Sequence, residues 1–174
     1  MSQPPKFWEK PARYDGVDYD LSHLKPLTRQ LKRGTGIDIP LIFNFSYHCC
    51  TDKADLRRGL GTRIIDEPRP TEERFLCPVR WFLSQRLRNH VQADDRVRLA
   101  RTAGYQWLNK EPIPGLSSQW VIFFKVMPGP PGGSVMVSVE SAYLASVAPQ
   151  GGQPEVFKFI VEQTRRTNKL YGSA

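Results

Sequence analysis

Apolar side chains recur at every second position between residues 37 and 47, and this is the clearest pattern in the chain. Apolar residues occupy every second position from Ile37 to Tyr47, with Asp38, Asn44 and Ser46 among the residues between them. A period of two puts neighbouring side chains on opposite faces of a strand, so the pattern predicts a β-strand with one buried face. Pro40 favours either an edge position for this strand or a late start to its ladder, because proline cannot donate a hydrogen bond to a neighbour.

Two other stretches, residues 22–33 and 71–91, repeat apolar residues every three or four positions. The apolar positions of the first are Leu21, Leu24, Leu27 and Leu31. Those of the second are Val79, Leu83, Leu87 and Val91. This spacing lines up side chains on one face of an α-helix, so it predicts two helices with apolar faces toward the core. Pro78 is expected to kink the second helix or to start its second half.

Further apolar runs predict additional strands over residues 97–108, 119–127, 134–144 and 155–163. The turn-forming sequence PGPPGG at 128–133 joins the second of these runs to the third, as in a hairpin. No regular alternation of strand and helix is present, which argues against a parallel sheet. The order predicts the α+β class: an antiparallel β-meander of about four to five strands with two helices packed on one face.

The size and composition of the chain fit one folded domain. It has 174 residues, of which 40% are apolar, enough to form a core. Residues 1–20 mix prolines and aromatic residues, so we predict an irregular N-terminal arm that docks through its aromatic rings. A single α+β domain is expected over residues 21–171. Residues 51–70 are polar and contain glycine and proline, which predicts a long loop.

Charge is unevenly distributed along the chain. There are 25 lysine and arginine residues against 17 acidic ones, a formal net charge of +8. Residues 71–110 hold eight of the basic residues and four of the acidic ones, and seven of those eight are arginine. Arginine pairs bidentately with phosphate, so the excess favours RNA or another polyanion as partner. A solvated basic surface without a partner is the alternative interpretation.

Cysteine content and hydropathy predict a cytoplasmic protein that does not enter a membrane. Three cysteines, two of them adjacent, cannot form the framework of several disulfides that is typical of small secreted proteins. The first residues lack the apolar core of a signal peptide. The longest apolar run, residues 120–127, is interrupted by Lys125 and is too short to span a bilayer.

A basic surface for RNA is predicted from arginines in three segments. Arg96 and Arg98 alternate with apolar residues, so both emerge on one face of a strand. Tyr105, Trp107 and Tyr171 are close in sequence and could stack on exposed bases. The predicted RNA-binding residues are Arg80, Arg88, Arg96, Arg98, Arg165, Arg166 and Lys169.

Three residues are candidates for catalysis: His48, Glu140 and Tyr143. Metal-independent cleavage of RNA needs a base for the 2′-hydroxyl, an acid for the leaving oxygen and cations for the charge on phosphorus. Glu140 could be the base and His48 the acid. The alternative for Glu140 is an exposed position on an edge strand, so whether the protein is an enzyme stays open. The common phosphate-loop, Rossmann, hydrolase and zincin motifs are absent from the sequence.

A thiol or metal site is a further hypothesis. Its residues would be His48, Cys49, Cys50 and Cys77. The chain has neither a C-x-x-C nor an H-x-x-x-H pair, and adjacent strand residues point apart, so the favoured interpretation is buried thiols that fill the end of a strand. We expect no metal and no cofactor.

Two resemblances add to this picture. The strand motif formed by Phe45, Ser46, His48 and Cys49, followed by Thr51, and the run V-E-S-A-Y at 139–143 resemble landmarks of small bacterial proteins of similar length. That likeness implies no activity. The layout, helices packed against an antiparallel meander in a basic chain, is similar to that of RelE/ParE-like toxins, several of which are ribonucleases. No residue can be matched to their catalytic motifs, and a shared layout does not transfer function.

The leading expectation is a basic cytosolic RNA-binding protein, with a metal-independent ribonuclease of toxin type as its enzymatic version. The alternative is a non-enzymatic interaction factor of bacterial or phage origin that docks on an acidic protein partner. Its docking segment would be the arm with Phe7, Trp8 and Tyr14.

Overall fold

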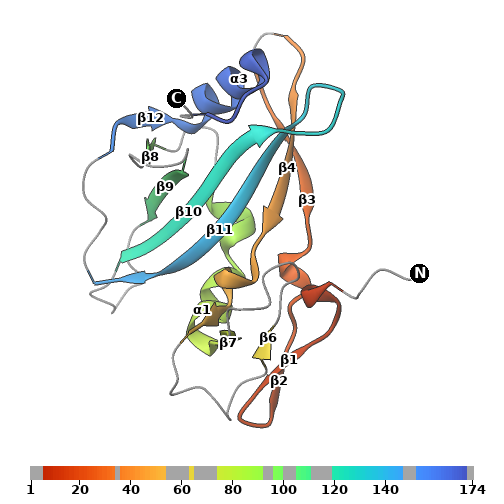
Figure 1. The fold of residues 1–174 in the computed structure, drawn as a ribbon, viewed down its shortest axis with the longest axis vertical. Helices are drawn as coiled ribbons and strands as arrows, with labels where there is room; N and C mark the ends of the chain where they lie inside the picture. Colours follow the sequence, from red (N-terminus) through yellow and green to blue (C-terminus); the bar gives the residue numbers. More distant parts are fainter. Residues whose placement is uncertain are drawn as a thin grey trace.

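The computed structural model describes residues 6–33, 36–53, 63–64, 74–91, 96–99, 105–110, 119–146 and 152–171. Within these ranges, the α+β class is confirmed: strands form one large and two small sheets, and three α-helices pack with them (Figure 1). No helix in these ranges is long and apolar enough to cross a membrane.

The large sheet has seven strands in the order β12-β8-β9-β10-β11-β4-β3. Their bounds are β3 Leu27–Leu31, β4 Ile39–Phe45, β8 Arg96–Leu99, β9 Tyr105–Lys110, β10 Gln119–Pro128, β11 Val135–Ala145 and β12 Pro154–Val156. Strands β8 to β11 form the predicted antiparallel meander. The pairing of β11 with β4 is parallel, with Val135 opposite Leu41 and Val139 opposite Phe45. The sheet is therefore mixed, with more strands than the sequence predicted.

Strand β4 confirms the alternation seen in the sequence. Leu41, Phe43 and Phe45 are buried and the residues between them are only partly buried. The strand lies inside the sheet, between β3 and β11, so of the two alternatives for Pro40 the edge position is wrong and the late start of the ladder is what the structure shows. Pro40 is tolerated because it pairs only with Gln30 of β3, and the ladder to β11 begins one residue later, at Leu41.

The helix predicted over residues 22–33 is wrong. A short 3-10 turn, η2 (Ser22–Leu24), is followed by β3, which pairs antiparallel with β4. Pro26 stands between the two elements, and proline disfavours helical conformation in the residue before it. Leu24 and Leu31 are both buried, so the leucine spacing marked core positions, but the backbone of residues 27–31 pairs with β4, the next strand of the chain, instead of forming a helix.

The helix predicted over residues 71–91 is shorter than expected. Strand β7 (Arg74–Leu76) comes first, and α1 (Pro78–Ser84) begins at Pro78, where the missing N–H costs nothing. A second short helix, α2 (Leu87–His90), follows. Leu83, Leu87 and Val91 are buried as the stripe predicts, whereas Val79 is 53% exposed. The strand β7 forms a three-stranded sheet with β5 (Thr51–Asp52) and β6 (Arg63–Ile64), two short strands that lie in the loop predicted over residues 51–70.

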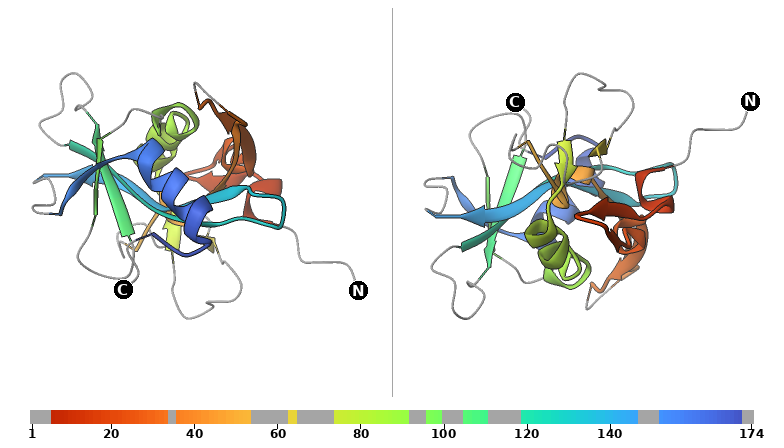
Figure 2. Two further views of the ribbon diagram at one scale, coloured as in Figure 1. Left: turned by 90° about the horizontal axis from the view of Figure 1, so that it is seen from above. Right: turned by 90° about the horizontal axis from the view of Figure 1, so that it is seen from below.

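The strand predicted over residues 155–163 is also wrong. Only residues 155 and 156 of the predicted strand belong to β12, and the residues from Phe157 onward belong to α3 (Phe157–Thr167). The buried residues of α3 are Phe157, Ile160, Val161 and Thr164. They recur at three- and four-residue intervals, which is helical spacing. Seen from above, α3 lies across the long strands β10 and β11 (Figure 2).

Residues 7–19, for which the sequence predicted an irregular arm, contain a 3-10 turn and a hairpin. The elements are η1 (Phe7–Glu9), β1 (Ala12–Tyr14) and β2 (Val17–Tyr19). Asp15 and Gly16 make the turn with φ values of 47° and 76°, the left-handed pair that a tight hairpin requires. The aromatic rings dock as expected: Phe7, Trp8 and Tyr14 pack against the core, and Tyr19 lies 5.0 Å from Trp81.

Candidate functional site

A cavity of about 470 Å³ opens beside η3 (Tyr47–Cys49), the turn that follows β4. Its lining residues are His48, Asp52, Lys53, Arg74, Arg80, Ser141 and Tyr143. They come from η3, β5, β7, α1 and β11. Three residues that the sequence singled out, His48, Arg80 and Tyr143, therefore meet in one hollow, and we call it the central cavity.

Local backbone contacts fix the position of His48. The Ser46 Oγ accepts a hydrogen bond from the backbone N–H of His48 at 3.3 Å, and the Ser46 N–H donates to the Val139 carbonyl at 2.9 Å. The first bond caps the turn and the second ties it to β11. The imidazole ring stands edge-on to Tyr47, with ring centres 4.4 Å apart. The serine of the F-S-x-H motif thus holds the histidine at the mouth of the cavity.

A β-bulge in β11 shapes the opposite wall. Phe123 pairs with Ser141 whereas Phe124 pairs with Val139, so Glu140 is the extra residue. A bulge turns the side chains that follow it, and bulges are frequent next to functional sites. Ser141 and Tyr143 consequently face the cavity. The sequence carried a signal for this bulge: the buried positions change from Val135, Val137 and Val139 to Ala142, which breaks the period of two.

Arg80 connects three walls of the cavity. Its Nη1 donates to the His48 carbonyl at 3.2 Å, and its Nη2 lies 3.9 Å from the Asp52 carboxylate. Its guanidinium also lies over the ring of Tyr143, 5.2 Å from the ring centre. The same ring stacks on Phe123, with ring centres 5.6 Å apart. Tyr143, which lines the cavity, is therefore held through its ring by Arg80 and Phe123.

Arg74 is a buried cation that the sequence did not identify as a site residue. Its side chain belongs to a residue only 6% exposed, and its Nε donates to the Thr51 Oγ at 3.0 Å. Burial lowers its pKa, since a charge in an apolar surrounding loses hydration. Nothing in its local sequence distinguishes Arg74 from a surface arginine. Only the pairing of β7 with β5 carries it inward.

His48 is neutral at pH 7. Burial, followed by the charge of Arg74, lowers the pKa of its imidazole to about 4, and the negative charge of Glu140 opposes this shift. A neutral imidazole accepts a proton but has no extra proton to give. The sequence predicted that His48 acts as an acid, which would require a bound anion to raise its pKa.

We expect the imidazole of His48 to titrate near pH 4 in an NMR pH series. In the unfolded protein the pKa of His48 is near 6.5, so the unfolded state takes up a proton at a higher pH than the folded state does. Stability should therefore drop between about pH 6.5 and pH 4, by about 2 kcal/mol after allowance for solvent screening of a half-buried ring. The variant His48→Gln should lose that part of the acid sensitivity. A His48 pKa near 6.5 in the folded protein would contradict the prediction.

Glu140, the predicted base, is half-buried at the bulge. Its Oε1 accepts a hydrogen bond from the Ser138 Oγ at 2.8 Å. Glu140 does not line the central cavity, yet its charge acts on the pKa of His48. Glu140 therefore acts on His48 through its charge and not as a residue that contacts a ligand in the cavity.

The predicted RNA-binding residues do not all share a surface. Arg88 has a structural role: its guanidinium donates hydrogen bonds to the backbone carbonyls of Ser22, His23 and Lys25 and so links α2 to η2. The side chains of Arg96 and Arg98 lie outside the described part of the structure, as do those of Tyr105 and Trp107.

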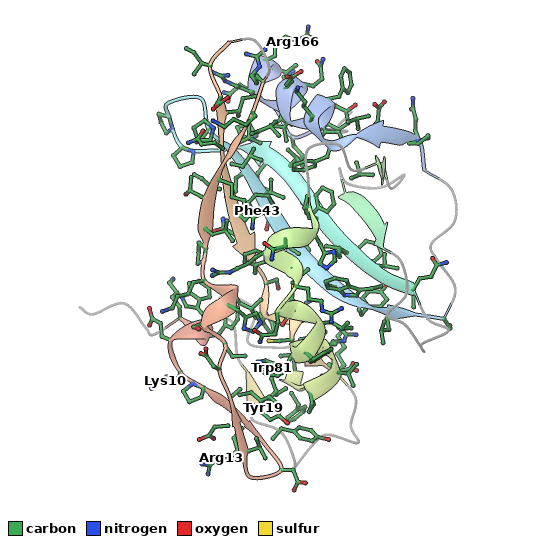
Figure 3. All side chains as sticks on the ribbon, turned by 180° about the vertical axis from the view of Figure 1, so that it is seen from behind. Lys10, Arg13, Tyr19, Phe43, Trp81 and Arg166 are labelled. Carbon is green, nitrogen blue, oxygen red and sulfur yellow. The ribbon has the colours of Figure 1, made fainter. Side chains whose placement is uncertain are left out.

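Arg165 and Arg166 lie in the last turn of α3, and Lys169 follows that helix. Figure 3 places Arg166 at one end of the molecule and Trp81, which follows Arg80 in the sequence, in the other half. Of the predicted RNA-binding residues whose side chains the structure describes, Arg80 therefore lines the central cavity, whereas Arg165, Arg166 and Lys169 lie at the end of α3.

The cysteines are buried beneath the cavity as thiols. Burial raises the pKa of Cys50 to about 12 and that of Cys49 still further. The Cys50 Sγ donates to the Tyr47 carbonyl at 3.3 Å. A thiol with so high a pKa is not a nucleophile at neutral pH. Among the described residues, no three histidine, cysteine or acidic side chains cluster as metal ligands would.

Comparison with known proteins concerns the chain as a whole. A family model, that of the YjaZ family, matches residues 11–165. No curated protein and no solved structure matches the chain. The matched range includes the hairpin β1–β2, the whole large sheet and most of α3, with every residue of the central cavity. The chain belongs to the YjaZ family.

Proposed function

We propose that this protein binds RNA and that a phosphodiester group of the strand occupies the central cavity. The observation that carries the proposal is the convergence of Lys53, Arg74 and Arg80 on a hollow whose described lining residues include one carboxylate, that of Asp52. Three cations from separate segments of the chain attract a phosphate more strongly where solvent is partly excluded. The cavity volume of about 470 Å³ lies within the range of small-ligand sites.

The state of His48 favours RNA over DNA. A neutral imidazole has a lone pair, which accepts a hydrogen bond from a hydroxyl. The 2′-hydroxyl is the group that distinguishes RNA from DNA at a given site. A phosphate bound by Arg74 and Arg80 would bring the neighbouring ribose toward His48, which lines the same cavity.

Binding to a short single-stranded RNA tests the proposal. We expect fluorescence anisotropy to show an affinity that falls steeply as salt rises from about 50 to 200 mM. Lys53→Gln should weaken binding and reduce the slope of log K against log salt by about 1, because one phosphate contact is lost. Lys53 is exposed, so the substitution leaves the core intact.

The matched control is Lys10→Gln, which removes the same charge from an exposed residue outside the central cavity. It should leave the salt slope unchanged. If both variants alter binding equally, the attraction is general and the cavity is not the site. Absence of binding at low salt would remove the proposal altogether.

The cavity also supports a second proposal, cleavage of the bound RNA by the chain's own acid and base. Neutral His48 would take the proton of the 2′-hydroxyl, and the 2′-oxygen would form a bond to phosphorus as the bond to the 5′-oxygen breaks. The phenol of Tyr143 would give its proton to that leaving oxygen, and Arg80, 5.2 Å from the ring centre, would stabilise the phenolate. The products are a 2′,3′-cyclic phosphate and a 5′-hydroxyl. Glu140 would stabilise the imidazolium that forms.

The alternative of a non-enzymatic docking factor rests on the aromatic residues near the N-terminus. Phe7 and Trp8 contact each other at 4.9 Å, and Phe7 lies 6.2 Å from Tyr47 of η3. Because Phe7 and Trp8 make these contacts within the molecule, less of their aromatic surface is left to contact a protein partner. The geometry of the central cavity therefore supports RNA better than a docked protein.

A further inference from the structure

A second basic hollow, of about 510 Å³, lies where the last turns of α3 meet β3 and β4. Its lining residues are Arg33, Ile39, Glu162, Gln163, Arg165 and Arg166. Arg33 follows β3, and Ile39 is the first residue of β4. We call this hollow the α3 cavity.

The α3 cavity carries more positive charge than its own residues neutralise. Arg33 pairs with Glu162 at 3.4 Å, and Arg166 donates to the neutral amide of Gln163 at 2.6 Å. Three guanidinium groups thus face one carboxylate. The negative end of the α3 dipole offsets only part of a charge. Like charges held together repel, and a bound anion would relieve that repulsion.

Arg165 is fixed in place by the β10–β11 turn. Gly133 of this turn has φ of +81°, and a Cβ on it would lie 3.3 Å from the Arg165 Nε. The turn therefore packs directly on the guanidinium. An arginine held in this way loses little further freedom when it binds an anion.

Strand β11 runs between the two hollows. It begins at Val135, just after the turn on Arg165, and Tyr143 near its other end lines the central cavity. The two hollows adjoin opposite faces of the strand, because Phe124, the partner of Val139, meets Phe157 of α3, whereas Tyr143 stacks on Phe123. At ~3.3 Å per residue the distance along the chain from Gly133 to Tyr143 is about 30 Å. Phosphates of a stacked strand repeat every ~3.4 Å, so an RNA strand needs at least about nine nucleotides, and more to pass around the edge of the sheet, to reach both hollows.

We infer that the α3 cavity is a second phosphate site for the same RNA, so that one strand engages both hollows. This inference rests on the proposed function, because it assumes that RNA occupies the central cavity. Two contacts on one strand make the second binding step intramolecular and raise the overall affinity. A strand too short to reach both hollows gains nothing from the α3 cavity.

A length series of single-stranded RNA tests the inference, with affinities measured by anisotropy for strands of about 4 and about 16 nucleotides. The variant is Arg166→Gln, an exposed residue whose described partner is Gln163 alone. We expect it to weaken binding of the long strand about fivefold or more, to lower its salt slope by about 1, and to leave the short strand unaffected. The matched control, Arg13→Gln, removes an exposed arginine near the N-terminus and should change neither strand.

The outcomes separate the two proposals. One outcome is that the long RNA binds Arg166→Gln as tightly as it binds the unmodified protein, while Lys53→Gln still binds it more weakly. The second site is then wrong, and the proposal of a phosphate in the central cavity remains supported. If Arg166→Gln weakens both strand lengths equally, the two hollows do not share a strand and the inference also fails. If neither strand binds the unmodified protein, the proposed function itself is overturned.

Discussion

Phe124→Ala lowers the free energy of unfolding by about 3–5 kcal/mol, the usual cost of a phenyl ring removed from a core. Phe124 is completely buried in β10, and its ring meets Phe157 of α3 edge-to-face, with centres 5.8 Å apart. This pair anchors the helix to the sheet. Its loss leaves a cavity and removes an aromatic contact worth about 1 kcal/mol by itself. Urea unfolding followed by circular dichroism measures the change.

The matched control is Phe82→Ala, which removes the same ring from α1. Phe82 is 53% exposed, so the cost should stay below about 1 kcal/mol even with its contact to Arg86 lost. The transition midpoint should move for Phe124→Ala with an unchanged slope. Equal destabilisation by the two variants would mean that β10 and α3 do not form the core described.

We expect His48→Gln to reduce the rate of the proposed RNA cleavage about 100-fold or more, the usual contribution of a general base. Glutamine keeps a polar group of similar size but cannot take the proton of the 2′-hydroxyl. RNA affinity should change less than threefold, because the cations of the cavity remain. A 5′-labelled RNA resolved on a gel gives the rate, and the cyclic phosphate end identifies the reaction.

The control for this variant is His23→Gln. His23 is also half-buried, but it bonds to Ser84 at 2.6 Å and does not line the central cavity. Its substitution should leave the cleavage rate within about threefold of the unmodified protein. Cleavage that persists unchanged in His48→Gln would show that His48 is not the base and that the activity, if any, comes from elsewhere.

Local patterns predicted β4 and the hairpin of β10 and β11, but not β3, although its partner β4 is the next strand in the chain. The alternation over β4 and the PGPPGG turn between β10 and β11 are sequence-local signals, and both are confirmed. The α3 segment failed because Phe157, Phe159 and Val161 also fit a period of two. Its helical stripe becomes visible only when Ile160 and Thr164 are known to be buried.

The candidate site was only partly visible because long-range pairing assembles it. His48 reaches Tyr143 because β4 lies parallel to β11, with Phe45 opposite Val139. Nothing local to either strand specifies that parallel partner. The sequence could therefore propose His48, Arg80 and Tyr143 by residue type, but it could not distinguish Arg74 in the cavity from Arg88, which ties backbone carbonyls.

We have proposed that an RNA phosphate occupies the cavity beside His48. An NMR titration of the histidine ring protons, with and without a saturating short RNA, tests for that phosphate. A bound phosphate adds negative charge beside the imidazole, which favours its protonated form. We expect RNA to raise the pKa of His48 from about 4 by one unit or more and to leave the pKa of His23, which lies outside the central cavity, unchanged. A His48 pKa that stays near 4 when the protein is saturated with RNA would show that no phosphate lies beside the ring.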